Sequence, residues 1–120
     1  MALTPSEHIG GGTLGTPEVI GTFTVSGTTY TKYRLAVDMG TITYDASHQH
    51  KVNHNISSLN PQNVLSLTIM ISNASMSIAA PYIGSTGSIS SWITSTQIVL
   101  VSSAEILSGN HAQAVVEYYK

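Results

Sequence analysis

Apolar and polar residues alternate along most of the chain from Val19 onward. In residues 29–39 the odd positions from 33 are apolar, and the even positions carry three charged residues: Lys32, Arg34 and Asp38. Because successive side chains of a strand point to opposite faces, this pattern predicts a half-buried antiparallel strand. Ser26-Gly27 lies just before it and is typical of a hairpin turn.

The same period of two recurs toward the C-terminus, between segments with turn signals such as Asn73-Ala74, Gly84–Gly87 and Gly109-Asn110. Residues 97–101 are apolar on both faces, as in a central strand, and residues 104–107 are too short for a helix and are expected to form a turn or loop. The predicted strands cover residues 20–25, 29–39, 41–44, 64–72, 75–82, 88–93, 97–101 and 112–119. With this many short strands, the fold class predicted is all-β, an antiparallel β-sandwich or jelly-roll over residues 19–120.

The N-terminal part of the chain lacks this alternation. Residues 1–18 contain Gly10-Gly11-Gly12 and two prolines, which resist regular structure. We expect an extended arm, either a disordered tail or an anchor that becomes ordered on a partner. This segment also lacks the basic and apolar regions of a signal peptide.

Charged residues make up only 8% of the chain, against about 25% in an ordinary soluble domain. Its 17 serines and 14 threonines provide most of the polarity. Four scattered basic residues and a net charge of -2 argue against nucleic acid as a partner. No apolar run approaches a membrane span, and the absence of cysteine excludes disulfides and thiolate sites. A weakly charged surface suits a chain that packs against copies of itself or a larger assembly.

Several short motifs from Tyr33 onward carry a family resemblance. They are the strand ending Asp38-Met39-Gly40, the segment Lys51–Ile56, Ala80-Pro81-Tyr82, and the C-terminal run Ala112–Lys120. Their order resembles the small C-terminal β domain of bacteriophage tail-fibre, head-fibre and related appendage proteins. Asn55 stands where that family usually has Gly, and Tyr119 where it often has Thr.

The resemblance implies a structural, non-enzymatic phage protein, displayed on the virion and commonly trimeric. Since the chain has an arm in place of a fibre shaft, the expectation is a small fibre, appendage or capsid-surface decoration protein that contacts other virion proteins through residues 1–18. The alternative is a carbohydrate-binding module for host attachment. For the alternative we single out Trp92 and Tyr82, because aromatic rings stack on sugars, although such residues are also common in strands and at subunit interfaces.

Three histidines lie at even spacing: His48, His50 and His54. On an extended segment they share a face, so His48 and His50 form a candidate metal pair. The other interpretation is a polar edge segment with a hydrogen-bonded His54, and we expect no cofactor. No nucleophile elbow or paired carboxylates appear, so no catalytic residues are expected.

The last predicted strand has two different faces. Ala112, Ala114, Val116 and Tyr118 are suited to the core, whereas Val115 and Tyr119 share the other face with one charge. That mixture predicts a subunit interface at Val115 and Tyr119.

Overall fold

The computed structural model describes residues 15–120, which form two packed antiparallel sheets and contain no α-helix. The all-β, two-sheet prediction is confirmed. Residues 1–14, most of the expected arm, lie outside the described part.

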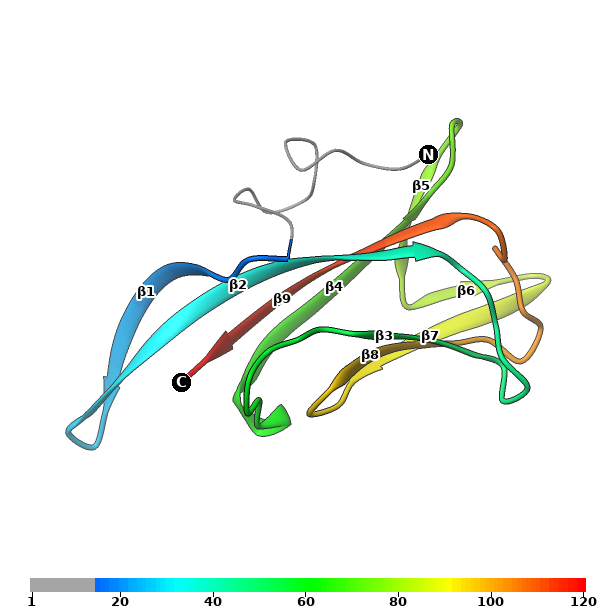
Figure 1. Cartoon of the computed structure of the whole chain (residues 1–120). Coiled ribbons are helices and arrows are strands. Elements are labelled where there is room, and N and C mark those ends of the chain that lie inside the picture. The colour runs from blue at the N-terminus through cyan, green and yellow to red at the C-terminus, as the bar shows by residue number, and fades with distance from the viewer. Residues whose placement is uncertain (1–14) are drawn as a thin grey trace.

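The first sheet has the order β1-β2-β9-β4-β5 and the second has the order β3-β8-β7-β6 (Figure 1). The first sheet consists of β1 (Glu18–Val25), β2 (Thr28–Thr41), β9 (His111–Tyr119), β4 (Val64–Ser72) and β5 (Ser77–Ala80). The second consists of β3 (Gln49–Asn53), β8 (Gln97–Val101), β7 (Gly87–Ile93) and β6 (Tyr82–Gly84), and a 3₁₀ turn, Pro61–Asn63, precedes β4. β2 pairs with β9, and β3 pairs with β8, so these pairs are nested along the sequence as in a jelly roll. β4 departs from the nested order, because it pairs with the next strand in sequence, β5.

Most predicted strands are found, with three differences. Residues 75–82 divide into β5 and β6 at Pro81, which has no N–H for a ladder. The short strand expected at 41–44 is absent, because β2 ends at Thr41, whereas Gln49–Asn53 forms a separate edge strand. Residues 104–107 are turns and loop, as expected.

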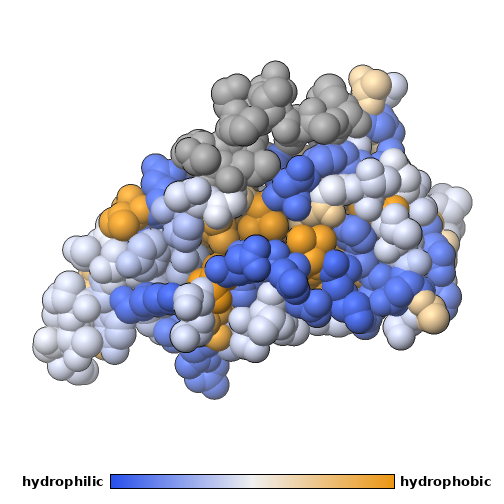
Figure 2. All heavy atoms as spheres, in the orientation of Figure 1, coloured by the Kyte–Doolittle hydropathy of each residue, from blue (hydrophilic) through white to orange (hydrophobic). Residues whose placement is uncertain are grey.

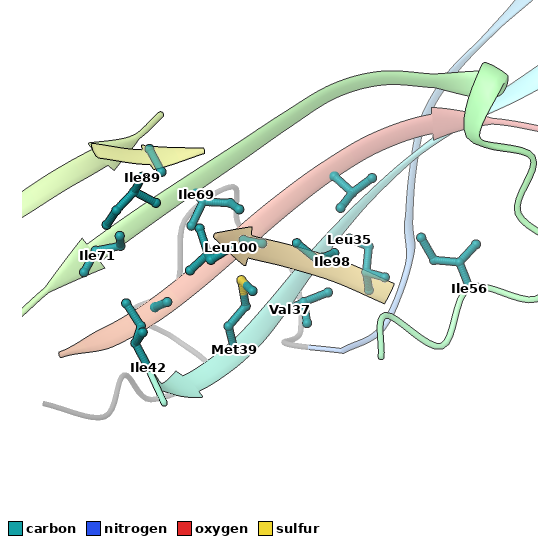
Figure 3. Close-up of a cluster of buried hydrophobic side chains, with 14 of the residues drawn as sticks. Leu35, Val37, Met39, Ile42, Ile56, Ile69, Ile71, Ile89, Ile98 and Leu100 are labelled. Carbon is teal, nitrogen blue, oxygen red and sulfur yellow. The ribbon is translucent and has the colours of Figure 1, made fainter. Parts of the chain in front are cut away.

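The core lies between the two sheets and consists mainly of aliphatic side chains (Figure 3). Leu35, Val37 and Met39 enter it from β2, and Ile98 and Leu100 enter it from β8. The alternation predicted for β2 and for the inward face of β9 is therefore confirmed. Both faces of β9 are buried along most of its length, as is typical of the central strand of a sheet.

The hairpin of β1 and β2 extends beyond the area that the second sheet covers (Figure 1). Its turn, Ser26-Gly27, has positive φ at both residues (50° and 82°), the geometry of a two-residue hairpin. The molecule is correspondingly elongated, with extents of 49 × 29 × 22 Å.

Candidate functional site

An aromatic cluster covers the outer face of the projecting hairpin. Phe23 of β1 stacks on Tyr30 of β2 with ring centroids 5.4 Å apart, and Tyr119 of β9 meets both rings edge-on at 5.1 and 5.3 Å. The register explains the contact, since Phe23 is paired with Tyr30, and Lys32 is paired with Tyr119. We call these three rings the aromatic cluster.

Leu65 lies beside the aromatic cluster. A bulge between Val64 and Ser66 shifts the register of β4 against β9, and Leu65 lines a shallow hollow together with Phe23 and Lys32. Its side chain is 50% exposed. Strict alternation over residues 64–72 would place Leu65 on the core face of Leu67, Ile69 and Ile71, but the extra residue of the bulge breaks the alternation.

The inner face of the same hairpin is polar. It carries four threonines: Thr22, Thr24, Thr29 and Thr31. The hydroxyl groups of Thr24 and Thr29 form a hydrogen bond of 3.1 Å. In the rest of the sandwich the apolar side chains of the main core cluster lie between the two sheets. The hairpin thus has the opposite polarity, with its apolar side on the outer face.

The interface residues predicted on β9 have different surroundings. Tyr119 belongs to the aromatic cluster and is partly exposed. Val115 is only 7% exposed within the chain and has little surface to offer a partner. The interface prediction therefore depends on Tyr119. Phe23, Tyr30 and Leu65 were missed by sequence reasoning.

Arg34 and Glu117 form an ion pair near the cluster. The guanidinium of Arg34 donates from Nε and Nη2 to Oε2 of Glu117, at 3.1 and 2.9 Å, and Ser66 donates to Oε1 of the same carboxylate. Neutralised charge and aromatic rings next to an exposed leucine make a surface that is suited to contact with another protein.

The two candidate glycan residues lie on opposite faces of the second sheet. Tyr82 is paired with Ile89, a core residue, so its ring is on the inward side, near Gly84. Trp92 is paired with Val99 on the outward side and is 41% exposed. The structure therefore does not bring Tyr82 and Trp92 together on one surface.

Two of the evenly spaced histidines bind backbone groups of their own chain. Nε2 of His50 is 2.8 Å from the Met39 carbonyl oxygen, and its Nδ1 accepts from Thr43 N–H at 3.2 Å. His54 is 3% exposed, with Nε2 2.9 Å from the Thr94 carbonyl oxygen and Nδ1 accepting from Ile56 N–H. Each ring thus has partners on both nitrogens.

His48 lies apart from them. Its φ of 61° is in the left-handed region, which ends the extended geometry that the spacing argument assumed. Its Nδ1 is 2.6 Å from Oε2 of the exposed Glu105. The candidate pair of His48 and His50 is thus not gathered as metal ligands, and residues 15–120 contain no group of three potential His, Asp or Glu ligands.

Asp45 and Tyr118 are two ionisable residues whose surroundings shift their pKa values. Oδ1 of Asp45 accepts from the backbone N–H groups of Ser47 and Gln49, and the Gln49 hydrogen bond is the main cause that holds the pKa of this carboxyl below its usual range. Burial raises the pKa of Tyr118, and the neighbouring Tyr33 adds to the shift.

None of the protein-family models, curated proteins or solved structures compared with this chain matches it. Across residues 15–120, no helix has both the length and the apolar character needed to span a membrane.

Proposed function

We propose that the chain is a non-enzymatic structural protein of a bacteriophage particle, a small oligomeric fibre, appendage or decoration protein. The observation that carries the proposal is the inverted polarity of the β1–β2 hairpin. Its aromatic cluster and Leu65 face outward, on a domain whose surface has few charges. Exposed apolar surface of this kind is typical of subunit contacts.

The oligomer we propose is a trimer whose copies meet through the aromatic cluster. Figure 2 shows one face of the molecule, where hydrophobic residues are visible within a mostly neutral to hydrophilic surface. Neutral hydroxyl-rich surfaces provide little self-repulsion between neighbouring copies. The trimeric state and the phage setting come from the family resemblance, which Asn55 supports: it stands at the family's usual glycine position and has φ of 58°, a conformation that favours glycine.

Analysis of purified particles tests the phage part of the proposal. Immunogold labelling and quantitative mass spectrometry are applied to virions of the phage that encodes the chain. We expect the protein at a fixed copy number, three per appendage for a fibre or hundreds for capsid decoration. Its absence from extensively purified particles would overturn the proposal.

A carbohydrate-binding module remains the second candidate, because Trp92 is exposed on the outward face of the second sheet. The cross-strand row places Trp92 beside Val99, with Lys51 on the far side of Val99. A ring in this position can stack on the apolar face of a host surface glycan.

For this candidate, Trp92→Ala is expected to weaken binding on a panel of host cell-wall and capsule glycans at least tenfold. Tyr82→Ala is the matched control, since its ring lies on the other face of the sheet. If no glycan binds the unmodified chain, or if both variants lose binding equally, Trp92 is not a glycan platform.

A further inference from the structure

Two charged side chains on the outer face of the first sheet, Lys32 of β2 and Glu18 of β1, take part in no salt bridge within residues 15–120. The other carboxylates in this part of the chain each lie within 3.4 Å of a basic or histidine side chain: Asp38, Asp45, Glu105 and Glu117. Of the other basic residues, two are ion-paired and the third donates a hydrogen bond to a backbone carbonyl: Arg34, Lys51 and Lys120. One charge of each sign is therefore left over among the described residues.

Both of these charges lie beside the aromatic cluster. Lys32 is the cross-strand partner of Tyr119, and it lines the shallow hollow together with Leu65. Glu18 is paired with Arg34, which is two residues along β2 from Lys32. Because residues two apart on a strand share a face, Glu18 and Lys32 are on the same side of the sheet. Lys32 is half-buried and Glu18 is exposed.

Contact between copies through the aromatic cluster would change the surroundings of Lys32. As the rings and Leu65 are covered, the ammonium group loses part of its water, and a charge removed from water without a partner is costly. A carboxylate from the neighbouring copy offsets this cost. Among residues 15–120, Glu18 is the side-chain carboxylate that is not already paired.

The symmetry of a cyclic trimer allows this pair to form at every contact. In such a ring the contact is heterologous, so a residue of one copy meets a different residue of the next copy. Each copy then donates from Lys32 to one neighbour and accepts at Glu18 from the other. Every Lys32 and every Glu18 in the ring is paired.

We propose that Lys32 of one copy forms an ion pair with Glu18 of the next copy, and that this pair fixes how neighbouring copies are placed against each other. Complementary charges set the register of an interface in this way. The inference rests on the proposed oligomerisation through the aromatic cluster, and it names the polar contact that accompanies the rings.

Charge reversal in the full-length chain tests the pair. Sedimentation equilibrium measures the concentration at which half of the chains are assembled, and circular dichroism checks that each variant is folded. Lys32→Glu and Glu18→Lys should each raise this concentration at least tenfold, because like charges then face each other between copies. Lys51→Glu is the matched control. It changes the net charge by the same amount as Lys32→Glu but lies on the second sheet, so it should leave the concentration unchanged.

A mixture of the two reversed chains distinguishes a pair between copies from a pair within one chain. Glu18→Lys carries two positive charges at these positions and Lys32→Glu carries two negative ones, so opposite charges face each other wherever the two variants are neighbours. We expect the mixture to assemble at a concentration at least threefold lower than either variant alone, with mixed rings visible by native mass spectrometry. A pair within one chain gives no gain on mixing.

The outcomes separate this inference from the proposed function. If the unmodified chain is a trimer but the reversals have no effect, or mixing gives no gain, the pair is overturned and oligomerisation through the aromatic cluster stands. A monomeric unmodified chain would overturn both.

Discussion

His54 links two loops by accepting from one backbone group and donating to another. It is almost fully buried, and its ring lies between the Thr94 carbonyl and the Ile56 N–H. The neutral ring with its proton on Nε2 satisfies both partners. This role explains a buried histidine without invoking a metal.

Replacing His54 with Ala should therefore be costly. The substitution removes two hydrogen bonds, leaves buried backbone groups unpaired and opens a cavity, so we expect a loss of about 2–4 kcal/mol in the free energy of unfolding. His48→Ala is the control, because its ion pair with Glu105 is exposed and should contribute less than about 1 kcal/mol. Urea denaturation measures both; equal losses would contradict the account.

Asp45 predicts a pH response. Its carboxyl has a lowered pKa in the folded chain, caused first by the Gln49 N–H and also by Ser47 and Lys51. A lowered folded pKa means that the carboxylate stabilises the fold above its unfolded pKa, and that this contribution is lost as the pH falls through the folded value. An NMR titration of the side-chain carboxyl should give a pKa below that of an unfolded peptide. An equal or higher value would show that the turn does not favour the charged form.

The spacing of the histidines was informative only in part. His54 engages backbone groups as the polar edge interpretation expected, and His50 does so as well, but His48 departs because of its positive φ. A left-handed residue is common at Gly or Asn and uncommon at His, so the residue type gave no signal of it.

At the level of elements, the loop between β8 and β9 packs against the start of β7. A Cβ added at Gly87 would lie 2.7 Å from Cβ of Ala104 and 3.0 Å from Cγ2 of Ile106. Glycine therefore permits the close approach of this loop to β7.

Gly87→Ala tests that contact, with Gly21→Ala as a matched control. Both glycines have similar φ, 154° and 158°, but nothing lies within 4 Å of a Cβ at Gly21. Because both variants carry the same backbone strain, Gly87→Ala should lower the free energy of unfolding by about 1–3 kcal/mol more than Gly21→Ala does, through steric overlap. Thermal unfolding of the two variants measures the difference, and similar melting temperatures would show that the loop adjusts without cost.

Strand positions were largely predictable because alternation and turn residues determine them. The limits of β4 and β8 agree with the pattern, and Ser26-Gly27 forms the expected turn. The bulge that exposes Leu65 was not predictable, since an extra residue leaves the residue types of a strand unchanged while it changes the face to which they point.

For the whole molecule, the aromatic cluster is the surface through which we propose that copies of the chain meet. Tyr119 was predicted from the composition of its strand face. Phe23 and Tyr30 were also within reach of the sequence, because a two-residue turn at Ser26-Gly27 pairs position 23 with position 30. Their meeting with β9 depends on the strand order, which local patterns do not specify.

The most direct test of oligomerisation through the aromatic cluster is the mass of the full-length chain by sedimentation equilibrium at micromolar concentration. We predict a trimer, about three times the 12.7 kDa of one chain. Leu65→Asp and Tyr119→Asp should reduce it to a monomer with a normal β signal in circular dichroism, whereas Thr24→Asp, on the other face of the hairpin, should leave it unchanged. A monomeric unmodified chain, or an oligomer unaffected by Leu65→Asp and Tyr119→Asp, would contradict the account.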